Sequence, residues 1–197
     1  MLDDIKIVNL SELGNEYKEK AVRLFVDAFY NMYSSVSKDK KILNDLFLSS
    51  LDFSLIYIAI SDNNVTGFMG IANNKKRTMH FDKIKCIGLF GKLKGVIIYY
   101  QLRALLEKPN VTNDTDLCID YIATDEHYRG KGIATKLIEY ACNGLGYKDC
   151  YLEVLSRNVT AKRLYEHAGF VEYKRVHNPV SLMQGGCIVE MKKQLVS

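Results

Sequence analysis

The stretch from Tyr128 to Leu137 contains two glycines, Gly130 and Gly132, which flank Lys131 and follow Arg129. Glycine in or beside a regular element costs about 0.5–1 kcal/mol relative to alanine, so this loop needs a backbone that other residues adopt poorly. The first amides of a following helix have no partner within that helix, and the helix dipole makes this end partly positive. The stretch therefore predicts a site for an anion, most naturally a phosphate group, to which Arg129 and Lys131 add positive charge.

Two common phosphate-binding motifs do not fit this loop. A Walker loop requires Gly-x-x-x-x-Gly-Lys-Ser/Thr, and Thr135 does not stand where this pattern needs it. The dinucleotide-binding pattern Gly-x-Gly-x-x-Gly would have Thr135 at its third glycine. Taken alone, the stretch is also compatible with a basic, solvated loop before an amphipathic helix. The neighbouring elements are needed to distinguish this interpretation from an anion site.

The elements around the loop form a strand–loop–helix–strand unit. Leu117–Thr124 and Tyr151–Leu155 have the composition of strands. Between them, apolar residues recur on one face of a helix: Ile133, Leu137, Ile138, Ala141 and Leu145. Two strands joined by a helix usually lie parallel in one sheet, so residues 117–155 predict a parallel pair with the glycine loop between the first strand and the helix.

The remaining segments alternate between helical and strand patterns. Helices are expected over Glu16–Tyr33, from a cap at Ser37-Lys38-Asp39 through Leu51, over Lys92–Glu107 before Pro109, and over Thr160–Ala168. The helix at 92–107 is indicated by Leu93, Val96, Ile97, Tyr100 and Ala104. Strands are expected at Ile5–Leu10, Ser54–Ser61, Val65–Ala72, Phe170–Val176 and Cys187–Lys193. Turns are expected at Asp62-Asn63-Asn64, which predicts a hairpin, and at Gln184-Gly185-Gly186. The order indicates a mixed α/β fold in one domain, residues 1–197.

The composition limits the class of protein. A chain of 197 residues with 48% hydrophobic and 25% charged residues has the size and balance of one globular domain. The net charge of +4 suits an anionic ligand but is small for a nucleic-acid-binding surface. The first residues lack the pattern of a signal peptide, and no apolar run approaches the roughly 20 residues that span a bilayer. We therefore expect a cytoplasmic protein with no nucleic-acid or membrane partner.

The five cysteines and four histidines are scattered, with no Cys-x-x-Cys pair and no metal-ligand spacing. The cysteines are typical of reduced thiols in a core, and neither a disulfide framework nor a metal site is expected. No cysteine has a histidine partner by sequence, so a covalent acyl-enzyme is not indicated.

With these elements in place, Arg129-x-x-Gly132-x-Ala134 resembles the Gln/Arg-x-x-Gly-x-Gly/Ala motif of the GNAT superfamily of acyl-CoA-dependent N-acyltransferases. The resemblance continues upstream through Asp120-Tyr121-Ile122-Ala123-Thr124-Asp125, and downstream through Leu152-Glu153-Val154, Asn158, Ala161, Leu164-Tyr165 and Gly169-Phe170. It covers residues 117–175 well. Residues 1–110 match only in their order of a strand, two helices and a hairpin, and Glu126 stands where a proline is common.

The resemblance implies a GNAT-like fold, in which a central, mostly antiparallel sheet has one parallel strand pair splayed around the acyl-CoA site and helices cover both faces. Acetyl-CoA would be the co-substrate, bound within residues 117–175. The main chains of Ile122 and Thr124 would pair with the pantetheine arm. The pyrophosphate would be held by the loop amides of Arg129, Gly130, Lys131, Gly132, Ile133 and Ala134. Asn158 would hydrogen-bond the pantetheine or nearby backbone, and Tyr165 would lie beside the thioester sulfur. Considered singly, Asn158 is also typical of a helix cap and Tyr165 of a core aromatic.

Acetyl transfer from a thioester to an amine requires a neutral amine, a stabilised oxyanion and a protonated leaving thiolate. Tyr165 is the natural acid, and the backbone N–H of Ile122 or Ala123 is the expected oxyanion donor. Three carboxylates are candidates for the base: Asp116, Asp120 and Glu153. Asp116 and Asp120 share one face by strand alternation and Glu153 lies on the neighbouring strand, although each is equally typical of a solvated strand end.

The expected function is transfer of an acetyl group from acetyl-CoA to a primary amine of a small molecule, in a ternary complex. The helix at 92–107, with Tyr99 and Tyr100 near its middle, is expected to wall off the acceptor groove and to favour a small molecule. An acetyltransferase of protein N-termini or lysines, and a non-catalytic acyl-CoA-binding sensor, remain alternatives. The sequence does not identify the amine, and a homodimer is left open.

Overall fold

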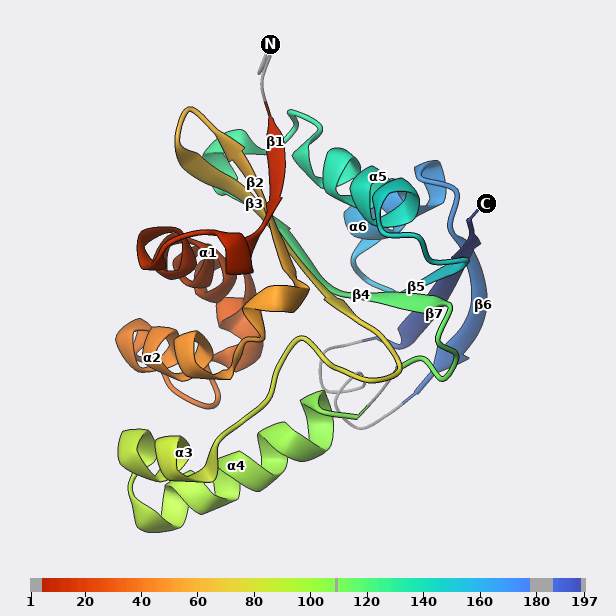
Figure 1. Cartoon of the computed structure of the whole chain (residues 1–197). Helices are drawn as coiled ribbons and strands as arrows, with labels where there is room; N and C mark the ends of the chain where they lie inside the picture. The colour runs from red at the N-terminus through yellow and green to blue at the C-terminus, as the bar shows by residue number, and fades with distance from the viewer. Residues whose placement is uncertain (1–4, 109, 178–185, 196–197) are drawn as a thin grey trace.

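The computed structural model describes residues 5–108, 110–177 and 186–195, which contain a seven-stranded sheet of order β1-β2-β3-β4-β5-β7-β6 (Figure 1). The strands are β1 (Lys6–Asn9), β2 (Ile56–Ser61), β3 (Asn64–Ala72), β4 (Asp116–Thr124), β5 (Asp149–Leu155), β6 (Val171–Val176) and β7 (Ile188–Gln194). Strands β4 and β5 are parallel, and the other neighbouring pairs are antiparallel. The expected mixed fold with one parallel pair is confirmed.

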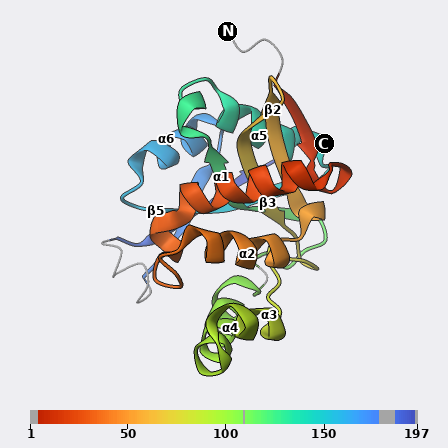
Figure 2. The ribbon, with the colours of Figure 1, turned by 90° about the vertical axis from the view of Figure 1, so that its left-hand side faces the viewer.

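Helices cover both faces of this sheet. They are α1 (Asn15–Tyr33), α2 (Lys40–Ser50), α3 (Lys83–Phe90), α4 (Lys92–Leu106), α5 (Ile133–Gly144) and α6 (Val159–His167). Helices α1 and α2 lie on one face, and α5 and α6 lie on the other (Figure 1). The pair α3–α4 projects beyond the end of the sheet, below α2 in both views (Figures 1 and 2).

Each face of the sheet has its own apolar core. Under α1 and α2, the ring of Phe25 lies 4.9 Å from that of Phe47 and 5.2 Å from those of Phe68 and Tyr121, measured between centroids. On the other face, the side of α5 predicted to be apolar is buried against the sheet: Ile133, Leu137, Ile138 and Ala141. Full burial of such large aliphatic side chains contributes about 1.5–3 kcal/mol each. The glycine loop therefore precedes a firmly anchored helix.

Single residues that the sequence analysis named explain where some helices and strands begin or end. Asp39 caps α2, because its carboxylate accepts a hydrogen bond from the Lys41 amide at 2.8 Å. Asp62 and Asn63 adopt φ values of 50° and 59°, a left-handed conformation that Asp and Asn tolerate better than most residues. The predicted hairpin of β2 and β3 is thereby confirmed.

The region between the hairpin and β4 was predicted less well. Helix α3 was not expected. It is capped by Asp82, the residue before its first turn, whose side chain accepts a hydrogen bond from the Lys85 amide at 2.9 Å. The helix expected at 92–107 is present as α4, but most of the apolar positions that predicted it face solvent, and the buried residues are instead Gly95, Ile98 and Leu102. Pro109, Gln184 and Gly185, named above in a helix stop and a turn, lie outside the described residues.

Candidate active site

Strands β4 and β5 pair over only part of their length. Asp116–Ile119 pairs with Asp149–Leu152, while β4 continues to Thr124 and β5 to Leu155. On its other side, β4 stays paired with β3 as far as Thr124. The main-chain N–H and C=O groups of successive residues point alternately to the two sides of a strand. Beyond Ile119, the main-chain groups of every second residue of β4 therefore point into the gap between β4 and β5. We call this gap the fork.

A β-bulge lies where the fork opens. Gly70 of β3 is opposite Tyr121 and Ile71 is opposite Ile119, so Asp120 is an extra residue in β4. Bulges bend a strand, re-aim its groups and are frequent beside active sites. The bulge thus gives β4 a change of direction at the point where β5 leaves it.

The glycine loop lies between β4 and α5, as the sequence predicts. Gly130 and Gly132 have φ values of 74° and 79°, which residues with a side chain rarely adopt. In the described part of the chain, the amides of Tyr128 and Lys136 donate hydrogen bonds to backbone carbonyls, and none of the amides between them does so. Lys131 Nζ lies 4.7 Å from the centroid of the Tyr128 ring. The loop therefore combines unpaired amides, a helix N-terminus and a nearby cation, the features of an anion site.

A third glycine lets α5 approach the sheet. A Cβ atom on Gly67 of β3 would lie 2.6 Å from the Ile133 Cγ2 atom and 3.0 Å from the Leu137 Cδ1 atom. Since Gly67 is opposite Thr124, the missing side chain brings the first turn of α5 down beside the end of β4. The loop and the open edge of β4 are held together by this contact.

Tyr165 and Asn158 both belong to α6. Tyr165 is buried in the core cluster that includes Leu152 and Ile119, and burial raises the pKa of its phenol to about 12. The Asn158 side chain caps the helix, since its Oδ1 atom accepts from the Ala161 amide at 3.2 Å. Its amide nitrogen donates no hydrogen bond within the described residues, so the cap leaves this donor available.

The side chain of Asp120, the extra residue of the bulge, is held in a polar cluster. Its Oδ2 atom accepts from Arg77 Nε at 3.1 Å and from Thr78 Oγ1 at 2.8 Å, and its Oδ1 atom accepts from Asn110 Nδ2 at 3.2 Å. The side chains of Arg77 and Asp120 are 9% and 1% exposed. Arg77 also donates to the Lys108 carbonyl and to Asn110 Oδ1. Breaking a buried pair of this kind typically costs about 3–5 kcal/mol.

Asp116 lies in a separate environment at the start of β4. It accepts hydrogen bonds from Asn113 Nδ2 at 3.0 Å and Thr115 Oγ1 at 3.3 Å, and it is buried. Asp116 is within the paired part of β4, whereas Asp120 stands where the fork opens. The two carboxylates that the sequence considered together are therefore in different polar clusters.

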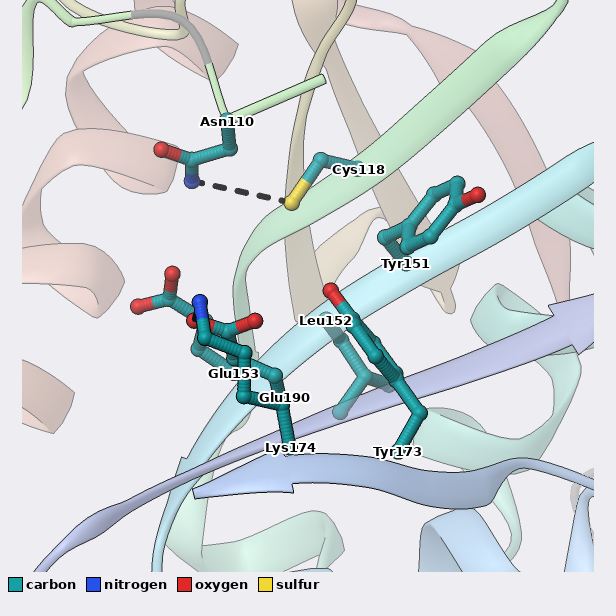
Figure 3. Close-up of a pocket in the computed structure, with 8 residues that line it drawn as sticks. All are labelled: Asn110, Cys118, Tyr151, Leu152, Glu153, Tyr173, Lys174 and Glu190. Carbon is teal, nitrogen blue, oxygen red and sulfur yellow. Dashed lines mark hydrogen bonds and ion pairs between the residues drawn. The ribbon is translucent and has the colours of Figure 1, made fainter. Parts of the chain in front are cut away.

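A pocket of about 310 Å³ opens beside the fork (Figure 3). Its lining residues come from β4 to β7 and from the connection after α4: Asn110, Cys118, Tyr151, Leu152, Glu153, Tyr173, Lys174 and Glu190. Neither Tyr99 nor Tyr100 lines it, so this pocket lends no support to the expectation that the helix at 92–107 walls off the acceptor groove, which stays a prediction. Asn110, Tyr173 and Glu190 were not predicted as site residues, because each lies away from the motifs in the sequence.

Glu153 is the first residue of β5 beyond its pairing with β4, and its carboxylate extends into the pocket (Figure 3). Glu153 keeps part of its surface exposed to solvent, but the neighbouring pocket walls partly desolvate its carboxylate. This desolvation, followed by the nearby negative charge of Glu190, raises the pKa of Glu153. Lys174 Nζ lies 3.1 Å from Glu190, whereas Glu153 has no ion-pair or hydrogen-bond partner among the described residues. Because Leu152 and Val154 are buried against α5 and α6, strand alternation puts Glu153 on the opposite face from Tyr165.

The cysteines are all buried, free thiols. Cys118 lines the pocket, but burial raises the pKa of its thiol well above the ordinary value, and this disfavours the nucleophilic thiolate. Among the residues that the structure describes, there is no group of three or more metal-ligating side chains. No helix within the same ranges has both the length and the apolar character needed to cross a membrane.

Comparison with known proteins agrees with this geometry. The family model described as an acetyltransferase (GNAT) domain matches residues 52–172, more than half of the chain. The chain therefore belongs to the GNAT acetyltransferase family. A search of curated proteins gave no significant sequence match.

Solved structures of this family share the fold. An N-acetyltransferase from Staphylococcus aureus Mu50 superposes with a TM-score of 0.61 at 16% identity, covering 95% of this chain and 100% of its own. A histone acetyltransferase HPA2-related protein from Corynebacterium glutamicum gives 0.65 at 18%, covering 98% and 97%. The ribosomal-protein-S18-alanine N-acetyltransferase from Escherichia coli gives 0.57 at 15%, covering 98% and 96%. These matches extend the similarity to the N-terminal half, which the motifs did not cover.

Proposed function

We propose that this protein transfers an acetyl group from acetyl-CoA to the primary amine of a small molecule while both substrates are bound. The observation that supports this proposal best is the fork. It has a glycine loop with the features of an anion site at one end and, on one face, a pocket whose Glu153 carboxylate has no partner among the described residues. The loop amides from Arg129 to Ala134 suit the coenzyme pyrophosphate. The open main chain of Ile122 and Thr124 suits the pantetheine arm, which would extend the sheet as an added strand.

In this proposal, the amine occupies the pocket and Glu153 binds its ammonium form. Glu153 then takes the proton, directly or through one water, because a carboxylate with a raised pKa is a better base near neutral pH. We prefer Glu153 to Asp120 and Asp116 as the base. The oxygens of Asp120 are occupied by Arg77, Thr78 and Asn110, and Asp116 is buried outside the pocket lining.

The neutral amine nitrogen then attacks the thioester carbonyl carbon. The backbone N–H of Ile122 or Ala123 donates to the oxyanion. When the tetrahedral intermediate collapses, the carbon–sulfur bond breaks and the thiolate accepts a proton from Tyr165, whose raised pKa keeps it protonated. The nitrogen, which became positively charged on attack, loses its second proton to water to give the neutral amide, and Tyr165 regains a proton from water. Glu153 and Tyr165 lie on opposite faces of the sheet, so the amine enters from one face of the fork while the leaving thiolate is protonated from the other.

A protein acceptor is the main alternative. The names of the C. glutamicum and E. coli proteins refer to histone and ribosomal-protein acetylation, and such acceptors also present primary amines. The pocket volume of about 310 Å³ admits either a small amine or one side chain of a peptide. We favour the small molecule because several side chains converge on the pocket from separate elements. A non-catalytic acyl-CoA sensor would bind the coenzyme without any transfer.

A panel of small amines, acetylatable peptides and whole proteins, incubated with acetyl-CoA and monitored for CoA release and acetylated product, tests these possibilities. Small-amine products dependent on Glu153 are expected. Products confined to peptides or proteins would contradict the proposed acceptor class, and coenzyme binding without any product would favour a sensor.

Direct transfer also predicts the kinetic pattern. Initial-rate plots against both substrates should intersect, and the protein incubated with acetyl-CoA alone should show no stable acetyl adduct by mass spectrometry. Parallel lines together with acetylated Cys118 or Cys142 would contradict direct transfer while leaving the coenzyme assignment intact.

A further inference from the structure

Helix α4 has a second apolar face, which no described part of the chain covers. Leu93, Ile97 and Tyr100 are 86%, 58% and 54% exposed. With Ala104, which is also exposed, they recur every three or four residues and form one stripe along the helix. We call these four residues the α4 stripe.

The opposite face of α4 already makes the contacts that hold the helix in place. Ile98 and Leu102 are buried in the core cluster under α1 and α2. Gly95 packs so closely on α3 that a Cβ atom there would lie 2.5 Å from the Cys86 carbonyl oxygen. The α4 stripe is therefore not needed for packing within the chain, and an amphipathic surface helix normally has one apolar face.

Basic residues border the α4 stripe on both sides. At about 100° per residue, Lys94 lies about 100° from Leu93 in one direction, and Lys92 and Arg103 lie about 80–100° away in the other. Lys83 of α3 lies next to the stripe, since its Nζ atom is 5.5 Å from the centroid of the Tyr100 ring.

One acidic residue, Glu107, lies at the C-terminal end of the stripe, where it lines a hollow with Tyr100, Arg103 and Ala104. Glu107 turns inward: its side chain is 14% exposed, accepts a hydrogen bond from the Phe81 amide and lies 3.5 Å from Arg103 Nε. Asp82 caps α3 through the Lys85 amide. The exposed face of α3–α4 thus combines an apolar centre with a positive border.

This charge pattern discriminates between partners. Two copies packed through the stripe would bring lysine borders close to each other. A bilayer surface rich in anionic lipid fits both parts of the pattern, because apolar side chains enter the boundary between head groups and acyl chains while lysines extend to the phosphates. We propose that the α3–α4 face docks on anionic lipid bilayers and holds the protein at a membrane surface without crossing it. This proposal departs from the expectation of no membrane partner and does not depend on the proposed acceptor.

Vesicle co-sedimentation of the full chain tests this proposal. The protein should sediment with vesicles of phosphatidylcholine mixed with phosphatidylglycerol, should sediment much less with phosphatidylcholine alone, and should be released by added salt. Replacing two border charges, Lys92→Gln with Lys94→Gln, should weaken partitioning about 25-fold, at about fivefold per charge. Ile97→Ser should weaken it about tenfold or more.

The matched control is Met32→Ser, which removes an exposed apolar side chain of α1. It should sediment like the wild type, and all variants should keep the wild-type thermal midpoint because the replaced side chains are exposed. The proposal is overturned if the wild type does not bind anionic vesicles, or if Ile97→Ser and the lysine variant bind as well as the control. A concentration-dependent dimer that Ile97→Ser abolishes, in a protein that ignores vesicles, would instead assign the stripe to a second copy.

Discussion

The two sides of the fork differ in the kind of polar group that they present: main-chain amides on one side and side chains on the other. On the side proposed for the coenzyme, the loop and α5 are one continuous segment, and the groups proposed to bind a ligand are main-chain amides of Arg129–Ala134. On the pocket side, the polar groups are side chains from distant segments: Arg77, Asn110, Asp120, Glu153 and Glu190. Backbone ligands are fixed by local conformation, whereas side-chain ligands depend on tertiary assembly. The first kind of site therefore leaves a short motif in the sequence, and the second does not.

The largest effect is expected from Gly132→Asp, which tests whether main-chain geometry alone defines the coenzyme side. The variant strains a residue with φ of 79° and puts a negative charge at the expected phosphate position. Calorimetry should detect no acetyl-CoA binding. Gly146→Asp is the control, since Gly146 also has positive φ and open space but lies at the far end of α5. Unchanged affinity in Gly132→Asp would disprove the phosphate assignment.

Tyr165→Phe tests the one side chain on the coenzyme side to which we assign chemistry. Loss of the hydroxyl should lower kcat by about 10²–10⁴-fold, while coenzyme affinity is unchanged because the ring still packs. Tyr140→Phe, in the same core cluster, should leave kcat unchanged. Equal turnover of the two variants would make Tyr165 a core aromatic only.

Glu153→Gln tests the pocket side. The variant should reduce kcat/KM for the amine by about 10²-fold and leave acetyl-CoA affinity unchanged. Since the base acts when deprotonated, activity should fall as pH falls through the Glu153 pKa, which desolvation by the pocket walls and the charge of Glu190 raise above the ordinary 4.5. This acidic limb should disappear in Glu153→Gln and persist in Glu172→Gln, a variant outside the pocket. An acidic limb that survives in Glu153→Gln would assign the base elsewhere.

Asn158→Asp should produce the smallest change, and it separates the two roles of Asn158. Aspartate retains the acceptor that caps α6 but loses the amide donor, so stability should be kept while acetyl-CoA affinity falls by about fivefold, or about 1 kcal/mol. Asn158→Ala should lose about 1 kcal/mol of stability in addition. If Asn158→Asp bound acetyl-CoA as tightly as the wild type, the residue would be a cap alone.

The sequence predicted what depends on neighbours along the chain. The cap at Asp39, the Asp62–Asn63 turn and the buried face of α5 each follow from a few adjacent residues. It did not predict the Asp120 cluster, because Arg77 and Asn110 meet Asp120 only after β3, α4 and β4 have assembled. Alternation puts Asp116 and Asp120 on one face of their strand, but it reveals neither the bulge at Asp120 nor the point where the β4–β5 pairing ends, which separates their environments.

Arg77 connects the end of α4 with the pocket. Its guanidinium bonds the Lys108 carbonyl after α4, Asn110 in the pocket wall and Asp120 in the bulge. The helix proposed to dock on lipid and the pocket proposed to hold the amine therefore share one joint, the side chain of Arg77. Where two ligands act on the same joint, their affinities are thermodynamically linked: the factor by which lipid changes amine affinity equals the factor by which the amine changes lipid affinity.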